Sequence, residues 1–223
     1  MNVDVILTSY ARYDLLEQTL ESFFQYNDFP INQFFIYEDY GRDRMNTEQL
    51  SALQALKKKY AIDEVILPHR RQGQIKALDA LWSRVSTEYC FQMEDDWLFY
   101  RKGWIADSIA VMKEAPKICT VWLREHDDLN GHPVVTLDNG RYDLLSREHQ
   151  KRWHGFTFNP SVKRLADYHL LGTYGLYAMF SPSNPSRSEM IIGKEYYKRG
   201  FSAAVLKQEY IRHIGGDGRG IRK

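Results

Sequence analysis

Three consecutive acidic residues, Glu94, Asp95 and Asp96, follow a short apolar run from Tyr89 to Met93. The run is aromatic and too short for a helix, so it predicts a buried strand. Carboxylates crowded at the end of a buried strand repel one another and lose hydration, and a divalent cation is a counter-charge that relieves both effects. Oxygen ligands of this kind suit Mg²⁺ or Mn²⁺, often shared with substrate phosphates. A solvated acidic turn is the alternative interpretation.

The elements around these acids alternate between strand and helix. Helices are indicated by apolar stripes such as Leu16, Leu20 and Phe23, which recur with the spacing of one helical face. Strands separated by such helices imply right-handed crossover units and a mostly parallel sheet. The strands are predicted at residues 3–8, 34–37, 64–67, 89–93 and 118–123.

Polar clusters stand at the ends of four of the five predicted strands. In a parallel sheet these ends share one edge, near the point where the strand order reverses, and ligands bind there. Convergence of several clusters favours a binding site over a surface turn. The clusters are Thr8-Ser9-Tyr10 with Arg12, Glu38-Asp39, His69-Arg70-Arg71 and the acidic triplet.

Two common nucleotide motifs are missing from the sequence. No Gly-x-Gly-x-x-Gly follows the first strand, and no Gly-Lys-Ser/Thr phosphate loop occurs, so a dinucleotide dehydrogenase or P-loop enzyme is not indicated. Nucleotide binding would instead depend on a metal at Asp96, with Arg12, Arg70 or Arg71 contacting diphosphate oxygens. Each arginine taken alone is more often an ordinary surface residue.

Composition limits the function further. The chain has 223 residues and a formal charge of +1, which argues against a broad nucleic-acid surface. No apolar stretch is long enough to span a membrane, and the N-terminus shows no signal-peptide pattern. Cys90 and Cys119 lie in apolar runs and are expected to be free thiols. Together these features predict a cytoplasmic protein.

The second part of the chain has a different character from about His126 onward. Asn130-Gly131 and Asn139-Gly140 favour tight turns, so a β-hairpin is expected. Residues 181–188 are rich in serine and proline and are interpreted as a loop before a helix at 191–199. No linker is evident. We therefore expect one domain over 1–223, with a nucleotide-sugar-binding half at 1–125 and an acceptor-binding half with the tail at 126–223.

The order of these motifs resembles that of the GT-A glycosyltransferases, and most closely their family-2-like members. The resemblance rests on the first strand with Thr8-Ser-Tyr-x-Arg12, on Tyr37-Glu-Asp39, and on Glu94-Asp-Asp-Trp97 as a variant of the Asp-x-Asp motif. The segment Gly73-Gln-Ile-x-Ala-Leu strengthens it. The resemblance implies a Rossmann-like α/β domain with a mostly parallel sheet flanked by helices, and a smaller hairpin and loop region on the acceptor side.

The resemblance also implies roles for matching residues in the first half. Thr8, Ser9, Tyr10 and Arg12 would line the nucleotide pocket, together with Arg71. Asp39, or else Glu38, would accept a hydrogen bond from the base or ribose; the sequence Tyr37-Glu-Asp-Tyr40 departs from the family pattern and leaves both open. Asp96 would bind the metal, with Glu94 and Asp95 supporting it or holding the donor sugar.

Two residues in the second half match further family positions. Glu189 would open a helix beside the acceptor and act as the general base, or would only compensate a helix dipole. His213, before Ile214-Gly-Gly216, resembles a C-terminal metal ligand, and imidazole would favour Mn²⁺. The tail residues Arg219, Arg222 and Lys223 could cover the diphosphate.

The implied activity is a metal-dependent transfer of a sugar, with inversion, from a UDP- or GDP-sugar to a glycan or other hydroxyl acceptor. A nucleotidylyltransferase acting on sugar phosphates is one alternative, although the glycine-rich basic loop typical of that class is missing after the first strand. A non-catalytic sugar-binding module is another, and the intact acidic triplet argues against it.

Overall fold

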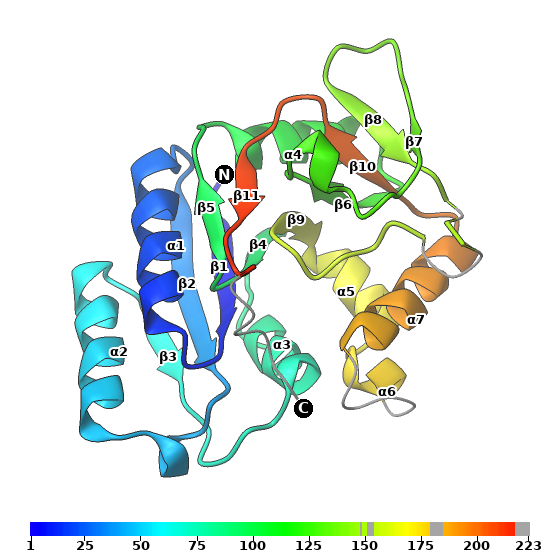
Figure 1. Ribbon diagram of the computed structural model, residues 1–223. Coiled ribbons are helices and arrows are strands. Elements are labelled where there is room, and N and C mark those ends of the chain that lie inside the picture. Colours follow the sequence, from blue (N-terminus) through cyan, green and yellow to red (C-terminus); the bar gives the residue numbers. More distant parts are fainter. Residues whose placement is uncertain (148, 151–153, 179–184, 217–223) are drawn as a thin grey trace.

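The computed structural model describes residues 1–147, 149–150, 154–178 and 185–216 (Figure 1). Its central sheet has five strands in the order β3-β2-β1-β4-β9. The first four are parallel, as predicted, and β9 runs antiparallel to β4. Their bounds are β1 (Val3–Ser9), β2 (Ile31–Glu38), β3 (Glu64–Ile66), β4 (Tyr89–Glu94) and β9 (Ser161–Arg164).

Both faces of β1 are buried, and its side chains alternate between two helical layers. Val5 and Leu7 pack in one core cluster with Leu16 of helix α1 (Tyr13–Tyr26), whereas Ile6 packs in a second cluster with Leu78 of helix α3 (Gln74–Trp82). This alternation follows from the two-residue period of a strand. The layers are formed by α1 (Tyr13–Tyr26), α2 (Thr47–Lys59) and α3 (Gln74–Trp82).

A second, smaller sheet lies beside the first and has the order β6-β10-β8-β7. It consists of β6 (Ile118–Trp122), β10 (Ser202–Leu206), β8 (Tyr142–Leu145) and β7 (Val134–Val135). The sequence predicted 118–123 as the next strand of one sheet; instead β6 lies in this second sheet, because β9 already pairs with the free edge of β4. The expected hairpin is present as β7 and β8, with Gly140 in the left-handed region.

A two-stranded ribbon brings the end of the described chain back to the acidic triplet. β5 (Trp97–Phe99) starts directly after Asp96 and pairs antiparallel with β11 (Ile211–His213). Figure 1 shows β11 beside β5, with this ribbon between α1 and the second sheet. His213 is thereby placed opposite Trp97 in the ribbon register.

The remaining helices connect and cover these sheets. They are α4 (Trp104–Glu114), α5 (Leu165–Leu171), α6 (Gly175–Ala178) and α7 (Pro185–Lys198), with short 3₁₀ turns η1 (Arg42–Arg44) and η2 (His126–Asp128). Both cysteines are free and buried, as expected. Among the described residues, none of the helices has the length and apolar character needed to cross a membrane.

Candidate active site

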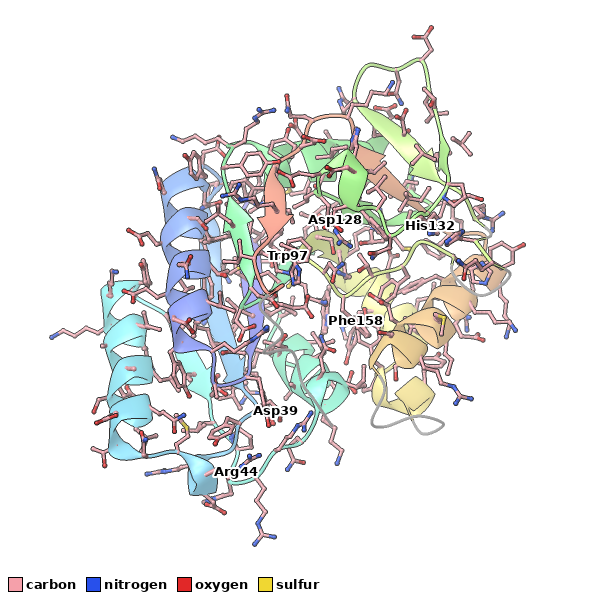
Figure 2. All side chains as sticks on the ribbon, viewed as in Figure 1. Asp39, Arg44, Trp97, Asp128, His132 and Phe158 are labelled. Carbon is pink, nitrogen blue, oxygen red and sulfur yellow. The ribbon has the colours of Figure 1, made fainter. Side chains whose placement is uncertain are left out.

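A small pocket opens where β1, β2 and β4 end. Its volume is about 110 Å³. Figure 2 shows the labelled Asp39 at this end of the central sheet, and Phe158 between the sheet and α7. Parallel strands gather their C-terminal polar residues at one edge, which is where a ligand pocket is expected. The pocket is lined by Thr8, Ser9, Tyr10, Arg12, Asp39, Gln74, Ala77, Glu94 and Asp95.

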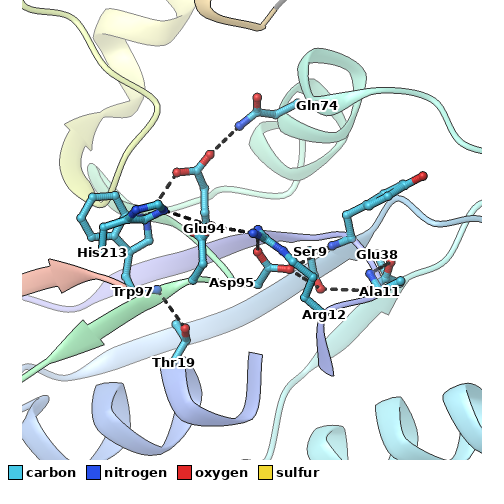
Figure 3. Close-up of polar contacts among 12 residues, drawn as sticks. Ser9, Ala11, Arg12, Thr19, Glu38, Gln74, Glu94, Asp95, Trp97 and His213 are labelled. Carbon is cyan, nitrogen blue, oxygen red and sulfur yellow. Dashed lines mark hydrogen bonds and ion pairs between the residues drawn. The ribbon is translucent and has the colours of Figure 1, made fainter. Parts of the chain in front are cut away.

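Asp95 fixes the turn that connects β1 to α1. Its buried Oδ2 accepts hydrogen bonds from the Ser9 hydroxyl at 3.1 Å and from the Tyr10 backbone N–H at 3.0 Å. Its Oδ1 is paired with Arg12 (Figure 3). Burial raises the pKa of Asp95, and the charge of Arg12 opposes that rise. Asp95 therefore shapes the pocket wall through the main chain that it holds.

Glu38 holds the same turn from its other side. The side chain is fully buried, and Oε1 accepts the backbone N–H groups of Ala11 at 3.0 Å and Tyr40 at 2.9 Å. Oε2 lies 2.9 Å from the Ser9 hydroxyl (Figure 3). Ala11 has a φ of +54°, a strained value for a residue with a side chain, and the bond from its N–H to Glu38 stabilises it. Glu38 thus stabilises the β1–α1 turn and does not itself line the pocket.

Asp39 lies on the pocket wall and anchors the loop before α3. Its Oδ1 accepts the backbone N–H of Gln72 at 2.7 Å, and its Oδ2 accepts that of Gly73 at 2.9 Å. Burial raises its pKa, and these two hydrogen bonds oppose the rise. The Arg71 Nε lies 3.8 Å from Oδ2, and the guanidinium lies 4.9 Å from the centre of the Tyr10 ring. Of the two acids left open by the sequence, Asp39 is the one that lines the pocket.

Glu94 lies at the end of β4 and also lines the pocket. Its Oε1 accepts the side-chain N–H of Gln74 at 2.7 Å, and Oε2 lies 3.4 Å from the Trp97 indole nitrogen (Figure 3). Burial, with the charges of Asp96, Glu189 and Asp95, raises the pKa of Glu94 to about 7. Near neutral pH a carboxyl group with this pKa can accept a hydrogen bond from a sugar hydroxyl when ionised, or donate one to it when protonated.

Asp96 is the acid of the triplet that contacts two basic side chains. Its Oδ2 lies 2.7 Å from Arg12 Nη1 and 3.2 Å from His213 Nε2. Burial alone would raise the pKa of Asp96, but the hydrogen bond from His213 and the charge of Arg12 lower it below its ordinary value. The backbone N–H of Ile214 donates to the Asp96 carbonyl at 2.9 Å, which ties the tail to this residue.

Asp96 and His213 together have the chemistry of a shared metal site. Among the described residues, no group of three or more His, Cys, Asp or Glu side chains could enclose a metal ion. Two protein ligands suffice when substrate phosphates complete the shell. A carboxylate and an imidazole within 3.2 Å of each other, beside the pocket-lining Asp95, fit such an ion, and the nitrogen ligand favours Mn²⁺ over Mg²⁺.

Glu189 comes from the other half of the chain. The sequence predicted a loop to residue 188 and a helix opened by Glu189; instead α7 begins at Pro185, since proline suits the first helical position, and Glu189 lies one turn inside. Its Oε1 accepts the backbone N–H of Phe158 at 2.5 Å. Burial raises the pKa of Glu189, and hydrogen bonds from Phe158 and Thr157 oppose the rise. The charge of Glu189 is also one of the causes that raise the pKa of Glu94.

Sequence reasoning gave no site role to Gln74 or Asn159, and it named Gly215 only as a neighbour of His213. Gln74 binds Glu94, and its position directly after Gly73 at the start of α3 was the available signal. Asn159 reaches Glu94 Oε2 at 3.2 Å when its amide nitrogen faces that side chain. At Gly215 a Cβ would lie 2.4 Å from Asp96 Oδ2, so only glycine fits there. The tail residues Arg219, Arg222 and Lys223 lie outside the described residues.

Comparison with known protein families assigns this chain to one of them. The family model described as Glycosyl transferase family 2 matches residues 4–181, which is most of the chain. None of the curated proteins matches the chain significantly. The match includes β1, the Asp39 region, the acidic triplet and β9. It ends before Glu189 and His213.

Solved structures with the same fold are glycosyltransferases of the GT-A type. Mannosyltransferase PcManGT from Pyrobaculum calidifontis, in complex with GDP-Man and Mn²⁺, has a TM-score of 0.66 and 13% identity over 97% of this chain and 58% of that chain. Residues 1–349 of S. aureus TarS, in complex with UDP-GlcNAc, have a TM-score of 0.63 and 13% identity over 97% of this chain and 61% of that chain. GalNAc-T7, with UDP, GalNAc and Mn²⁺, has a TM-score of 0.64 and 11% identity over 99% and 45%. This chain therefore spans less than two thirds of the length of each.

Proposed function

Because the chain belongs to glycosyl transferase family 2, we propose that it transfers a sugar from a nucleoside diphosphate sugar to a hydroxyl group of an acceptor. The observation that carries the proposal is the pocket at the ends of β1, β2 and β4, which is lined by Glu94, Asp95 and Arg12. Arg12 also pairs with Asp96, the residue that contacts His213. A nucleotide sugar as donor is supported by similar structures that contain GDP-Man or UDP-GlcNAc.

The nucleotide would lie along the ends of β1 and β2. Thr8, Ser9 and Tyr10 form that part of the pocket wall. Asp39 would accept a hydrogen bond from the base or the ribose, and Arg71 would lie over the nucleoside from its position above the Tyr10 ring. UDP and GDP donors both satisfy this arrangement, since each presents hydroxyl and N–H donors.

The diphosphate and the donor sugar would lie toward the acidic triplet. Asp96 and His213 would hold Mn²⁺ or Mg²⁺ together with the diphosphate, and the bound ion would neutralise the charge of the leaving group. Arg12 can pair with phosphate oxygens through its guanidinium. Glu94, oriented by Gln74, would hold hydroxyl groups of the sugar, and Asp95 would keep the β1–α1 turn in place.

Glu189 would act on the acceptor as the general base. It takes the proton of the attacking hydroxyl, whose oxygen then forms the new bond to the anomeric carbon. The bond from that carbon to the diphosphate oxygen breaks, and its electron pair leaves with the nucleoside diphosphate. Attack opposite to the leaving group, and hence inversion, is expected from the family resemblance and not from the spacing of these residues.

The test is a donor screen followed by product analysis. Thermal shift with UDP-, GDP- and dTDP-sugars, with and without Mn²⁺, should identify a donor that raises the melting temperature. That donor should then release its nucleoside diphosphate in an Mn²⁺-stimulated reaction with acceptor or water. Release of pyrophosphate from a nucleoside triphosphate and a sugar phosphate would instead indicate a nucleotidylyltransferase. A melting shift without any turnover would indicate a non-catalytic sugar-binding module.

A further inference from the structure

Arg12 pairs with two acids of the triplet at once. Its Nη1 lies 2.7 Å from Asp96 Oδ2, and its Nη2 is paired with Asp95 Oδ1 (Figure 3). The arginine side chain is 18% exposed and those of the two acids 1% and 11%, so water screens these pairs weakly. One guanidinium therefore compensates the carboxylates of both Asp95 and Asp96.

The same oxygen of Asp96 is approached from two further directions. His213 Nε2 lies 3.2 Å from Oδ2. The backbone at Gly215 passes so close that a Cβ would lie 2.4 Å from Oδ2 and 2.9 Å from His213 Nε2. A cation that binds Asp96 Oδ2 would therefore also lie close to Arg12, to His213 and to the backbone of Gly215. Of these three, Arg12 is the one with a permanent positive charge.

We propose that Arg12 is the resident counter-ion of Asp96 and competes with the divalent ion for that carboxylate. The proposal rests on the proposed function, which makes Asp96 the metal ligand. The diphosphate of the donor is the anion that relieves the competition, because Arg12 lines the donor pocket and guanidinium forms two parallel hydrogen bonds with phosphate. Metal and donor then assist each other's binding, and this coupling is reciprocal.

The size of the competition follows from the spacing of the charges. An opposite charge within about 4–6 Å shifts the proton affinity of a carboxylate by roughly 10- to 1,000-fold. The positive charge of the same guanidinium repels a divalent ion that binds to Asp96. Removing the charge of Arg12 should therefore raise the Mn²⁺ affinity of the nucleotide-free protein by about tenfold or more.

The experiment measures Mn²⁺ binding directly, by electron paramagnetic resonance and calorimetry, without any sugar donor. Arg12→Met removes the charge and keeps most of the length, and Arg12→Lys is the matched control that keeps a charge. Arg12→Met should bind Mn²⁺ at least about tenfold more tightly than wild type, with Arg12→Lys near wild type. Saturating UDP should strengthen Mn²⁺ binding by a larger factor in wild type than in Arg12→Met.

A second variant separates competition from misfolding. In Arg12→Ala, added methylguanidinium at millimolar concentration should weaken Mn²⁺ binding, whereas wild type should show no response. An Arg12→Met affinity equal to or below that of wild type would overturn the proposal, as would no effect of methylguanidinium on Arg12→Ala. These results do not depend on turnover, so a protein that binds Mn²⁺ as expected but transfers no sugar would refute the proposed function alone.

Discussion

The two halves of the molecule differ in how many carboxylates they hold through main-chain N–H groups. In the first half Asp39 and Glu38 each accept two backbone N–H groups, and Asp95 accepts one together with the Ser9 hydroxyl. In the second half Glu189 is held by the backbone N–H of Phe158 and by the side chain of Thr157. The donor side is therefore organised by main-chain contacts. Substitutions there should damage binding, whereas substitution of Glu189 should damage turnover.

The largest effect is expected from Asp96→Ala. Loss of the metal carboxylate removes a charge stabilisation worth several kcal/mol, so transfer should fall by about 10³-fold or more. Mn²⁺-dependent donor binding should be lost while the circular dichroism spectrum stays unchanged. His213→Ala is the matched control: it keeps the carboxylate and should lower Mn²⁺ affinity without abolishing it. Mn²⁺-stimulated transfer by Asp96→Ala would show that the ion binds elsewhere.

Glu189→Gln tests the other half of the comparison. The amide keeps the shape and removes the basic oxygen, so turnover should fall by about 10²–10⁴-fold. Donor and Mn²⁺ affinities, measured by calorimetry, should remain near wild type, because Glu189 is not among the residues that line the donor pocket. Equal losses of binding and turnover would make Glu189 a structural residue. Near-normal turnover would assign the base to another group.

Asp39→Ala should have an intermediate effect, confined to binding. The change removes the acceptor that the base or the ribose would use, and the loss of a buried acceptor costs about 1–3 kcal/mol. Nucleoside diphosphate affinity should therefore weaken by roughly 5- to 150-fold. Calorimetry with UDP and GDP is the measurement, and Asp39→Asn, which retains one acceptor oxygen, should lose less. An unchanged dissociation constant would remove Asp39 from the nucleotide site.

Much of the first half could be predicted because its signals are local. A strand period of two and a helical stripe identify β1, α1 and β4, and parallel order then brings Arg12, Asp39 and Asp95 to one edge. The pairing of these acids with particular backbone N–H groups could not be predicted. It depends on the left-handed conformation of Ala11 and on the path of the loop at Gln72, neither of which has a periodic signal.

The second half was predicted less completely because its contacts are distant in sequence. Gly215 fits against Asp96, and only the folded ribbon of β5 and β11 shows why glycine is needed there. Strand β9 was not predicted at all. Its sequence, Ser161-Val-Lys-Arg164, carries a lysine whose side chain is 2% exposed, and a buried charge contradicts the pattern expected of a core strand.

Lys163 lies where the two halves meet, since β9 belongs to the second half of the chain and pairs with β4 of the first. Its Nζ lies 2.5 Å from the Ser161 hydroxyl and 5.7 Å from the centre of the Phe156 ring. Burial lowers the pKa of Lys163 to about 8, although the neighbouring Cys90 and other groups oppose this. At neutral pH the folded protein therefore contains a buried ammonium group, which is solvated less well than it would be in water, and this lowers stability.

An effect on the free energy of unfolding is expected from Lys163→Met. In the unfolded chain a lysine has a pKa near 10.4, so between about pH 8 and pH 10 the unfolded state binds more protons than the folded state. The free energy of unfolding of wild type should accordingly rise with pH in that window relative to the variant. Below pH 8 the cost of burying the charge is fully present, and Lys163→Met should be more stable than wild type by about 1–3 kcal/mol at pH 7.

Urea unfolding of both proteins at pH 7 and pH 10 measures this difference. The advantage of Lys163→Met should shrink toward pH 10, and the exposed Lys58→Met should show no comparable change between the two pH values. A wild type that is more stable than Lys163→Met at pH 7 would mean that the ammonium group is held by the carboxylates around it. In that case Lys163 would stabilise the charged forms of Glu94 and Glu189, and the contact between the two halves would be electrostatic rather than a tolerated burial.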